Sequence, residues 1–313
     1  MDFNDISRLS EEQARKYLES LCWPDGAECP HCNSKNVASL QNKASGNRKR
    51  REGLYSCRDC RKQFTVTVGT IFEGARIPIR TWLLAFSLMF ASKKGISSHQ
   101  LHRMLGITYK SAWFMSMRVR HAMAKEPLVG MLSGKVEADE TYVGGKIGNM
   151  SNYQRRKIRK TGSRFDNKTP VLALVERDGN VRTRVVANVT SKNLKTFLTE
   201  NIAKKSTLYT DEFRGYKNIG KEFSKHRTVM HNIHQYVKGD ASINSAESFF
   251  SLLKRGVTGS FHHISPEHLQ RYSDEFSWRW NRRKVSDEER TINTLKMIEG
   301  AKMYYRDPLR KAS

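Results

Sequence analysis

The chain has 313 residues, 38% of them hydrophobic, and carries 56 Lys and Arg against 31 Asp and Glu, a formal net charge of +25. Its length allows two or three domains. Positive charge spread over the whole chain favours a polyanionic partner, with nucleic acid the first candidate and an anionic membrane surface the alternative. The longest apolar run, residues 81–91, is far shorter than the roughly 20 residues of a membrane span, so it predicts a buried helix and no membrane partner.

The N-terminal segment predicts a helix over residues 11–21. Ser10 is a suitable N-cap, and two glutamates follow it in the first turn. The segment is polar and acidic, whereas a secretory signal is basic and then apolar. We therefore expect a cytoplasmic protein.

Four of the five cysteines form two Cys-x-x-Cys pairs, which are typical of a structural Zn²⁺ site. The 24 residues between the pairs exceed the usual ribbon spacing, so we expect an extended basic hairpin loop between them. Unrelated thiols are the alternative. Cys22 is left over, and its apolar neighbours predict a buried, inert thiol. The predicted zinc ligands are Cys29, Cys32, Cys57 and Cys60.

Residues 96–123 have the pattern of a helix-turn-helix. Apolar residues keep helical spacing on both sides of Gly106, and Thr108 can cap the second helix. The alternative is an ordinary helical hairpin with solvated charges. The second helix carries three candidate contacts to a DNA groove or phosphate, Lys110, Arg118 and Arg120.

From Val136 onward the pattern changes to that of a mixed α/β domain. Asp178-Gly179 predicts a hairpin turn, and a basic, glycine-rich insertion at 145–168 supplies Arg155 and Arg156 as candidate DNA contacts. The strands are expected at 136–143, 171–181, 182–190, 206–210 and 226–237, and the helices at 191–202 and 244–256.

Three acidic residues stand out in this basic chain. Asp139 lies on the first of these strands, Asp211 closes a later strand, and Glu247 lies on the last helix. Carboxylates on a DNA-binding surface repel phosphates unless a cation lies between them, and hard divalent cations prefer oxygen ligands. The pattern therefore predicts a site for two Mg²⁺ or Mn²⁺ ions held by these three residues.

Each carboxylate also has a structural alternative. The two aspartates could pair with nearby Lys or Arg at the strand ends. Glu247 could form a capping box with Asn244. Strand alternation places Asp139 and its neighbour Glu140 on opposite faces, so only one can face a shared site. Glu137, Glu140 and Glu212 compete with the three chosen residues.

Five stretches in order along nearly the whole chain resemble bacterial insertion-sequence transposases of the DDE class with an N-terminal zinc ribbon. They are WPDGAECPHC, YSCRDCRKQFTVTVGTIFEG, VEADETYVGGK, TDEFRGY and NSAESFFSLLKRG. The resemblance implies an α/β ribonuclease-H-like mixed-sheet catalytic domain, preceded by a zinc ribbon and a helix-turn-helix-like helical region. It carries the catalytic triad onto Asp139, Asp211 and Glu247, with Asn244 the alternative third residue, and Lys254 matches the family's basic position.

The resemblance also implies the activity. Such a transposase binds the terminal inverted repeats of an insertion sequence, cuts at its ends, and joins the freed 3′-hydroxyl to target DNA by two-metal phosphoryl transfer. We expect a homodimer or higher homo-oligomer on double-stranded DNA in the bacterial cytoplasm, associated with the nucleoid. The alternatives are a non-catalytic DNA-binding regulator and a structure-selective nuclease on the same fold. Further candidate DNA contacts are Lys254, Arg255, Arg282 and Arg283. The expected domains are residues 1–72, 73–128, 129–285 and 286–313.

Overall fold

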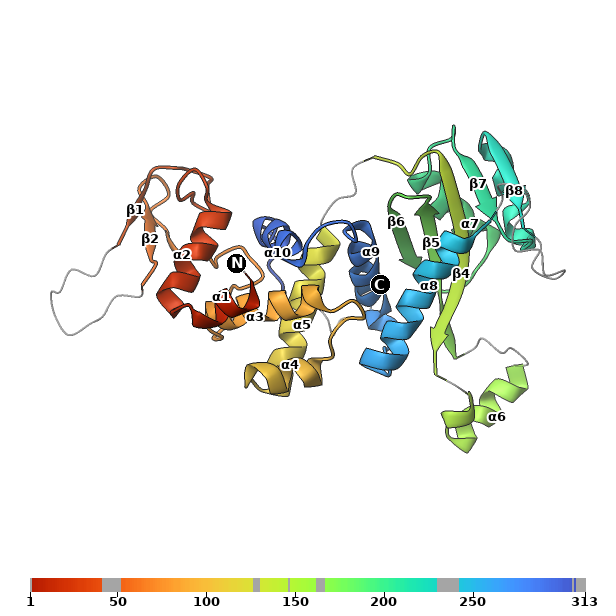
Figure 1. The fold of residues 1–313 in the computed structure, drawn as a ribbon, viewed down its shortest axis with the longest axis horizontal. Helices are drawn as coiled ribbons and strands as arrows, with labels where there is room; N and C mark the ends of the chain where they lie inside the picture. Colours follow the sequence, from red (N-terminus) through yellow and green to blue (C-terminus); the bar gives the residue numbers. More distant parts are fainter. Residues whose placement is uncertain are drawn as a thin grey trace. The chain divides into compact units, whose positions relative to one another are not determined.

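The fold comes from a computed structural model, which describes residues 2–40, 52–125, 130–145, 147–161, 167–229, 242–305 and 307. The chain separates into two compact units (Figure 1). The first combines residues 1–126 with residues 285–311, and the second is formed mainly by residues 127–284. The C-terminal segment thus belongs to the same compact unit as the zinc-ribbon and helical segments, from which it is distant in sequence.

The first unit begins with two short helices and a small sheet. The predicted N-terminal helix is confirmed, because the Ser10 side chain and Gln13 form a reciprocal capping box at its start. The sheet is antiparallel, in the order β1-β2-β3, and β1 and β2 form the hairpin between the cysteine pairs. The basic loop predicted inside this hairpin falls largely on residues 41–51, outside the described part. The elements are α1 (Phe3–Arg8), α2 (Glu11–Cys22), β1 (Val37–Ser39), β2 (Tyr55–Cys57) and β3 (Gln63–Phe64).

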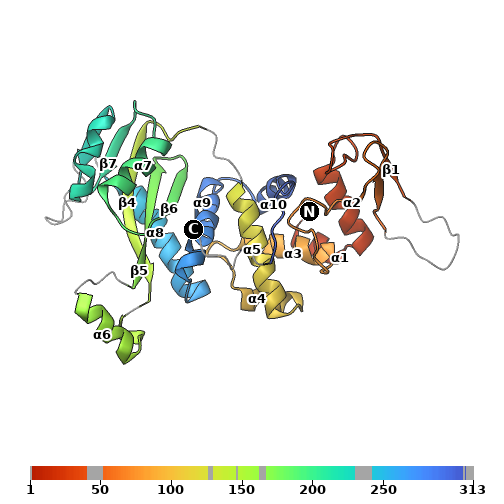
Figure 2. The same cartoon turned by 180° about the vertical axis from the view of Figure 1, so that it is seen from behind.

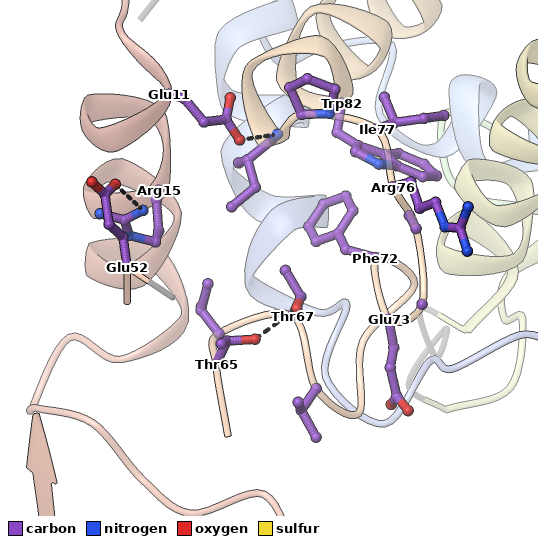
Figure 3. A pocket seen from close by; sticks show the side chains of 16 residues that line it. Glu11, Arg15, Glu52, Thr65, Thr67, Phe72, Glu73, Arg76, Ile77 and Trp82 are labelled. Carbon is purple, nitrogen blue, oxygen red and sulfur yellow. Dashed lines mark hydrogen bonds and ion pairs between the residues drawn. The ribbon is translucent and has the colours of Figure 1, made fainter. Parts of the chain in front are cut away.

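Four further helices complete the first unit. The apolar segment is a buried helix as expected. Its N-cap, Pro78, offers no side-chain cap, and the Glu11 carboxylate accepts the N–H groups of Ile79 at 2.5 Å and Arg80 at 3.2 Å instead (Figure 3). Gly106 ends the next helix in the left-handed conformation, and Thr108 caps the one after it through Ser111 N, so both helices predicted for this segment are present. These helices are α3 (Ile79–Ala91), α4 (Ser98–Leu105), α5 (Tyr109–Lys125) and α10 (Asp287–Lys296).

Two arginines of α5 are structural, which corrects the prediction that they contact DNA. Arg118 is 6% exposed, and its guanidinium donates to the carbonyls of Ile71, Glu73 and Met303. Arg120 is fully buried and donates to the Ser116 hydroxyl at 2.9 Å. Helical spacing did not reveal this, because long basic side chains can bury their stems and bond carbonyls inside a helical core.

The second unit is built on a five-stranded mixed sheet in the order β6-β5-β4-β7-β8. β4, β5 and β6 are antiparallel neighbours, while β7 runs parallel to both β4 and β8. The hairpin around Asp178-Gly179 is confirmed, with Asp178 at φ +60°. The last predicted strand begins as expected, and its part beyond residue 229 lies outside the described residues. The strands are β4 (Lys135–Gly144), β5 (Lys168–Glu176), β6 (Val181–Val185), β7 (Thr207–Thr210) and β8 (Lys225–Thr228).

Helices cover both faces of this sheet. In Figure 1 α8 (Asn244–Gly256) crosses in front of β4 and β5, and in Figure 2, seen from behind, α7 (Ser191–Asn201) lies on the near face. The α7 face is the main core, where Val136 and Ala138 of β4 pack with Leu194 and Phe197 of α7. α9 (Pro266–Asn281) packs along β6. The expected mixed α/β fold is confirmed, and α6 (Asn152–Thr161) lies within the basic insertion between β4 and β5.

None of the helices in the described part of the chain is both long and apolar enough to span a bilayer. The longest of them, α5, has 17 residues and carries Arg118 and Arg120 at its centre.

A half-buried carboxyl on α9, that of Asp274, makes stability depend on pH. Burial raises the pKa of Asp274 to about 6. The hydrogen bond from Gln270 and the positive charge of Arg271 lower this pKa, but their effect is smaller. The folded-state pKa of Asp274 lies above the ordinary value of 3.8. Its contribution to the free energy of unfolding is therefore fully present below about pH 4 and is lost as the pH rises through about 6. Asp274→Asn should therefore stabilise the second unit by about 1 to 3 kcal/mol above pH 6 and little at pH 4. Thermal melting between pH 4 and 8 measures this.

Asp178→Asn is the matched control, because Asp178 is an exposed turn residue where asparagine also tolerates positive φ. It should leave the pH profile of melting unchanged. An Asp274→Asn protein whose melting follows the wild-type profile at every pH would contradict the assignment.

Candidate active site

Parallel pairing of β4 with β7 brings Asp139 and Asp211 to one level of the sheet. Glu137 is paired with Tyr209, and two residues further on each chain stand Asp139 and Asp211. Parallel neighbours lie about 4.8 Å apart, so Asp139, in the middle of β4, lies beside the end of β7 that Asp211 follows. Asp211 closes β7 with a turn in which its Oδ1 accepts the N–H of Phe213 at 3.0 Å.

α8 carries the third predicted carboxylate toward the same region. A cavity of about 630 Å³ is lined by Asp139 and Glu140 of β4 and by Glu247 of α8, and Asp211 is not among its lining residues. Lys254 and Arg255 of α8 also line it, and both side chains are exposed. The helix is held on the sheet by its buried face, which includes Ala246, Phe249 and Leu253. Every third or fourth residue is thus buried, leaving Glu247, Lys254 and Arg255 on the cavity side.

Glu140 points to the opposite face of β4 from Asp139. Its Oε2 accepts the hydroxyl of Tyr216 at 2.7 Å, and Tyr216 belongs to the core cluster on the α7 face. Burial is the largest cause that raises the pKa of Glu140, to about 7, and the negative charges of Asp211 and Asp139 also raise it. The hydrogen bond from Tyr216 lowers this pKa in part. The contact with Tyr216 agrees with the alternation predicted for Asp139 and Glu140.

Glu137 is fully engaged in structural contacts. Its Oε1 accepts Arg177 Nε at 2.7 Å, and its Oε2 accepts the N–H groups of Ser245 and Ala246 at 2.8 and 3.1 Å. The capping box considered for Glu247 is not formed, because Asn244 is the first helical residue and no side chain of the N-cap, Ile243, caps the helix. The sequence pattern gave no sign of Arg177 or of this long-range cap.

The four predicted zinc ligands converge in the first unit. Their sulfur atoms all lie within 4.8 Å of one another, with 3.6 Å between the sulfurs of Cys29 and Cys60 and between those of Cys32 and Cys57. Each knuckle is followed by a residue at positive φ, Asn33 at 57° and Arg61 at 59°, and this bend aims both thiols of a pair inward. Asp59 ties the two knuckles together by accepting from Ser34 and, at 2.8 Å, from Asn36.

Within the described residues, no second group of three or more such ligands is drawn together as closely as the cysteines. Asp139, Asp211 and Glu247 are therefore farther apart than the cysteine sulfurs. Three carboxylates repel one another when no cation lies between them. Their donor chemistry, hard oxygen atoms beside exposed basic side chains, fits Mg²⁺ or Mn²⁺.

The other large cavity lies in the first unit and differs chemically. It has a volume of about 690 Å³ and is lined by α2, residues 65–78 and the start of α3 (Figure 3). Its carboxylates already have partners, since Glu11 caps α3 and Glu52 pairs with Arg15 at 3.3 Å. The cavity beside Asp139 and Glu247 is consequently the better candidate for an active site.

Comparison with known families assigns both units. Residues 131–281 match the model of an ISXO2-like transposase domain, and residues 9–63 match that of a transposase zinc-ribbon domain. A Haemophilus influenzae protein named "Uncharacterized transposase-like protein" is 30% identical over 118 residues, which cover 38% of this chain and 92% of that protein. The chain belongs to the ISXO2-like transposases.

A longer relative of this transposase spans most of both chains. A Halobacterium salinarum protein named "Uncharacterized protein in transposable element ISH50" is 28% identical over 279 residues. The match covers 87% of this chain and 91% of that protein. The zinc-ribbon match contains all four clustered cysteines, which supports a structural Zn²⁺ in this transposase.

The remaining candidate DNA contacts of the transposase lie on α5, on α6 and directly after α9. Lys110 on α5 is exposed, with Nζ 5.0 Å from the centre of the Tyr305 ring. On α6, Arg156 is exposed and Arg155 donates to the Gly148 carbonyl. After α9, the guanidinium of Arg282 lies 5.7 Å from the Trp278 ring and that of Arg283 lies 4.8 Å from the Trp280 ring.

Trp278 is 4% exposed and Trp280 packs edge-on against Phe249, so both tryptophans contribute to packing. Cys22 is half-buried, and burial raises the pKa of its thiol to about 12, as expected of an inert cysteine.

Proposed function

We propose that this transposase cleaves the ends of its insertion sequence and joins them to target DNA, with Asp139, Asp211 and Glu247 as the catalytic triad. The observation that carries the proposal is the parallel register of β4 and β7. It supports a common site for the two aspartates, and the shared cavity of Asp139 and Glu247 supports the third member. A five-stranded mixed sheet with helices on both faces is compatible with the ribonuclease-H-like fold.

In this proposal the three carboxylates hold two Mg²⁺ or Mn²⁺ ions. When bound, such ions activate the attacking oxygen and stabilise the leaving one during phosphoryl transfer. Glu140 takes no part as a ligand, because it faces Tyr216 on the other side of β4. Glu137 is excluded as well, since both its oxygens accept structural hydrogen bonds.

DNA is held by basic side chains around the site and beyond it. Lys254 and Arg255 contact phosphates beside the cavity, where an ammonium or guanidinium does not compete for the cation. α6 presents Arg156, Arg159 and Lys160, all exposed, as a second phosphate contact. The zinc ribbon and the α4-α5 pair recognise the inverted repeats, and joining two ends requires at least a dimer on DNA. In the bacterial cell the protein acts in the cytoplasm at the nucleoid.

A supercoiled plasmid that carries two element ends tests the function. Incubation of the purified protein with the plasmid and Mg²⁺ or Mn²⁺ should yield cut ends and joined products. Binding without cutting would instead identify a DNA-binding regulator. Cutting without joining would identify a nuclease on the same fold.

Lys254 should matter more for DNA joining than for stability. The residue stands seven positions after Glu247, about two helical turns and roughly 10.5 Å further along α8, so the two share a face. Lys254→Ala should lower joining of pre-cut ends roughly tenfold through loss of one charge-assisted phosphate contact, while Lys254→Arg stays partly active. Joining assays with thermal melting on the same samples measure both effects.

Lys217→Ala removes the same charge from an exposed site of the second unit and serves as the control. It should join ends as the wild type does. An equal loss of joining in both variants would mean that net charge matters and that Lys254 has no specific role.

A further inference from the structure

The helix that carries Glu247 is capped by a residue of another element. The first N–H groups of a helix have no partner within the helix, and a polar N-cap side chain normally accepts them. The N-cap of α8 is apolar Ile243, and the Glu137 carboxylate of β4 accepts the N–H groups of Ser245 and Ala246 in its place. Negative charge at this end of the helix also complements the helix dipole.

Arg177 completes the arrangement from the hairpin turn after β5. Its Nε donates to Glu137, and its Nη2 donates to the carbonyl and hydroxyl of Ser242 at 2.9 and 3.0 Å. The guanidinium lies 4.3 Å from the centre of the Tyr209 ring on β7. Glu137 and Arg177, here called the brace, thus connect β4, β7, the β5-β6 turn and the segment that enters α8.

Packing alone would not fix α8 as closely as the brace does. Apolar contacts between a helix and a sheet are non-directional, so they allow the helix to slide or rotate. Hydrogen bonds that the N–H groups of Ser245 and Ala246 donate to one carboxylate define both the rotation and the axial position of the first turn. The Glu137 side chain is only 1% exposed, and a buried charge of this kind is costly unless it is paired.

The brace stands next to two of the three proposed catalytic carboxylates. Glu137 and Asp139 share a face of β4 and are two residues apart, a distance of about 6.6 Å along the strand. Ala246, whose N–H the brace accepts, is the residue directly before Glu247. Any shift of α8 on β4 therefore changes the separation between the carboxylates of Asp139 and Glu247.

We propose that Glu137 and Arg177 are positioning residues that set Glu247 relative to Asp139, so that the three carboxylates bind divalent cations tightly. This inference rests on the proposed function, because it takes Glu247 to be a metal ligand. The brace itself touches neither the metal nor the DNA.

Mn²⁺ binding to the zinc-loaded full-length protein tests the proposal without relying on turnover. Glu137→Gln keeps the size of the side chain but removes the charge that two N–H groups and Arg177 share. Loss of such an outer contact should weaken Mn²⁺ binding by about 10-fold or more, measured by the electron paramagnetic resonance signal of free Mn²⁺. Amide hydrogen exchange in the peptide 244–250 should become faster.

Glu275→Gln is the matched control for the loss of a buried ion pair. Glu275 is fully buried on α9 and pairs with Arg279 at 2.6 Å, in the same unit. The control should lose thermal stability but bind Mn²⁺ as the wild type does. Equal weakening of Mn²⁺ binding in the two glutamine variants would overturn the proposal, because the effect would then be general destabilisation.

Arg177→Lys covers the case in which Glu137→Gln does not fold. It keeps a positive charge beside Glu137 but loses the fork that reaches Ser242, so Mn²⁺ binding should weaken by a few-fold. Wild-type Mn²⁺ affinity in a folded Glu137→Gln or Arg177→Lys protein, with Glu247→Gln binding poorly, would overturn the positioning role alone. Wild-type affinity in Glu247→Gln would overturn the proposed metal site and the positioning role with it.

Discussion

Asp139→Asn, Asp211→Asn and Glu247→Gln are each expected to lower end cleavage by roughly 1,000-fold or more. Metal ions contribute several kcal/mol to phosphoryl transfer, and each 1.4 kcal/mol is about tenfold in rate. Binding to end DNA should persist or tighten, because each substitution removes a negative charge from the phosphate-binding surface. Plasmid cleavage and gel-shift titrations on the same preparations measure the two effects.

Glu212→Gln is the control for this series, because it removes the same charge from the residue directly after Asp211. Its cleavage should stay close to that of the wild type. Robust cleavage by Asp211→Asn would remove that residue from the triad, and loss of DNA binding in all three variants would point to a folding defect.

Cys29→Ser and Cys57→Ser are expected to lose the zinc ion and unfold the ribbon. Both side chains are buried, at 0% and 1% exposure, in a small cluster with Phe64. Structural zinc contributes about 10 to 16 kcal/mol, which is comparable with the whole stability of a domain, about 5 to 15 kcal/mol. Metal analysis should fall from near one zinc per chain to near zero, and limited proteolysis should cut within residues 23–72.

Cys22→Ser is the control that shows whether zinc is lost only when a cysteine of the cluster is replaced. Its thiol lies outside the cluster, with Sγ 4.0 Å from the Leu295 carbonyl, so zinc content should be unchanged. The second unit should melt as in the wild type in all three serine variants, because it contains none of the ligands. A wild-type protein without zinc would refute the assignment of the cluster.

Local sequence patterns correctly predicted those features of the fold that depend on residues close together in the chain. The Cys-x-x-Cys spacing predicted the four-cysteine cluster, since each knuckle needs only one tight turn. Ser10, Gly106 and Thr108 predicted helix ends, because caps act within one turn. Strand alternation correctly separated Asp139 from Glu140.

Side-chain environments could not be read from the same patterns. Arg118 and Lys110 are both basic residues of α5, and the sequence pattern does not distinguish their environments. Arg118 is buried and donates to three carbonyls, whereas Lys110 is exposed. The capping box suggested by Asn244 and Glu247 fits the spacing, but the carboxylate of Glu137 already accepts the first-turn N–H groups. Such competition comes from residues that are more than 100 positions away.

The sequence by itself determined most element types, the four-cysteine cluster and the family, because these depend on short-range spacing and on motifs in a fixed order. Only the tertiary structure decided which carboxylates share a cavity and which serve the fold. The physical reason is that strand register and the seating of α8 on β4 are set by pairing and packing between distant segments. These contacts bring Asp139 level with Asp211, turn Glu140 toward Tyr216, and commit Glu137 to the first turn of α8.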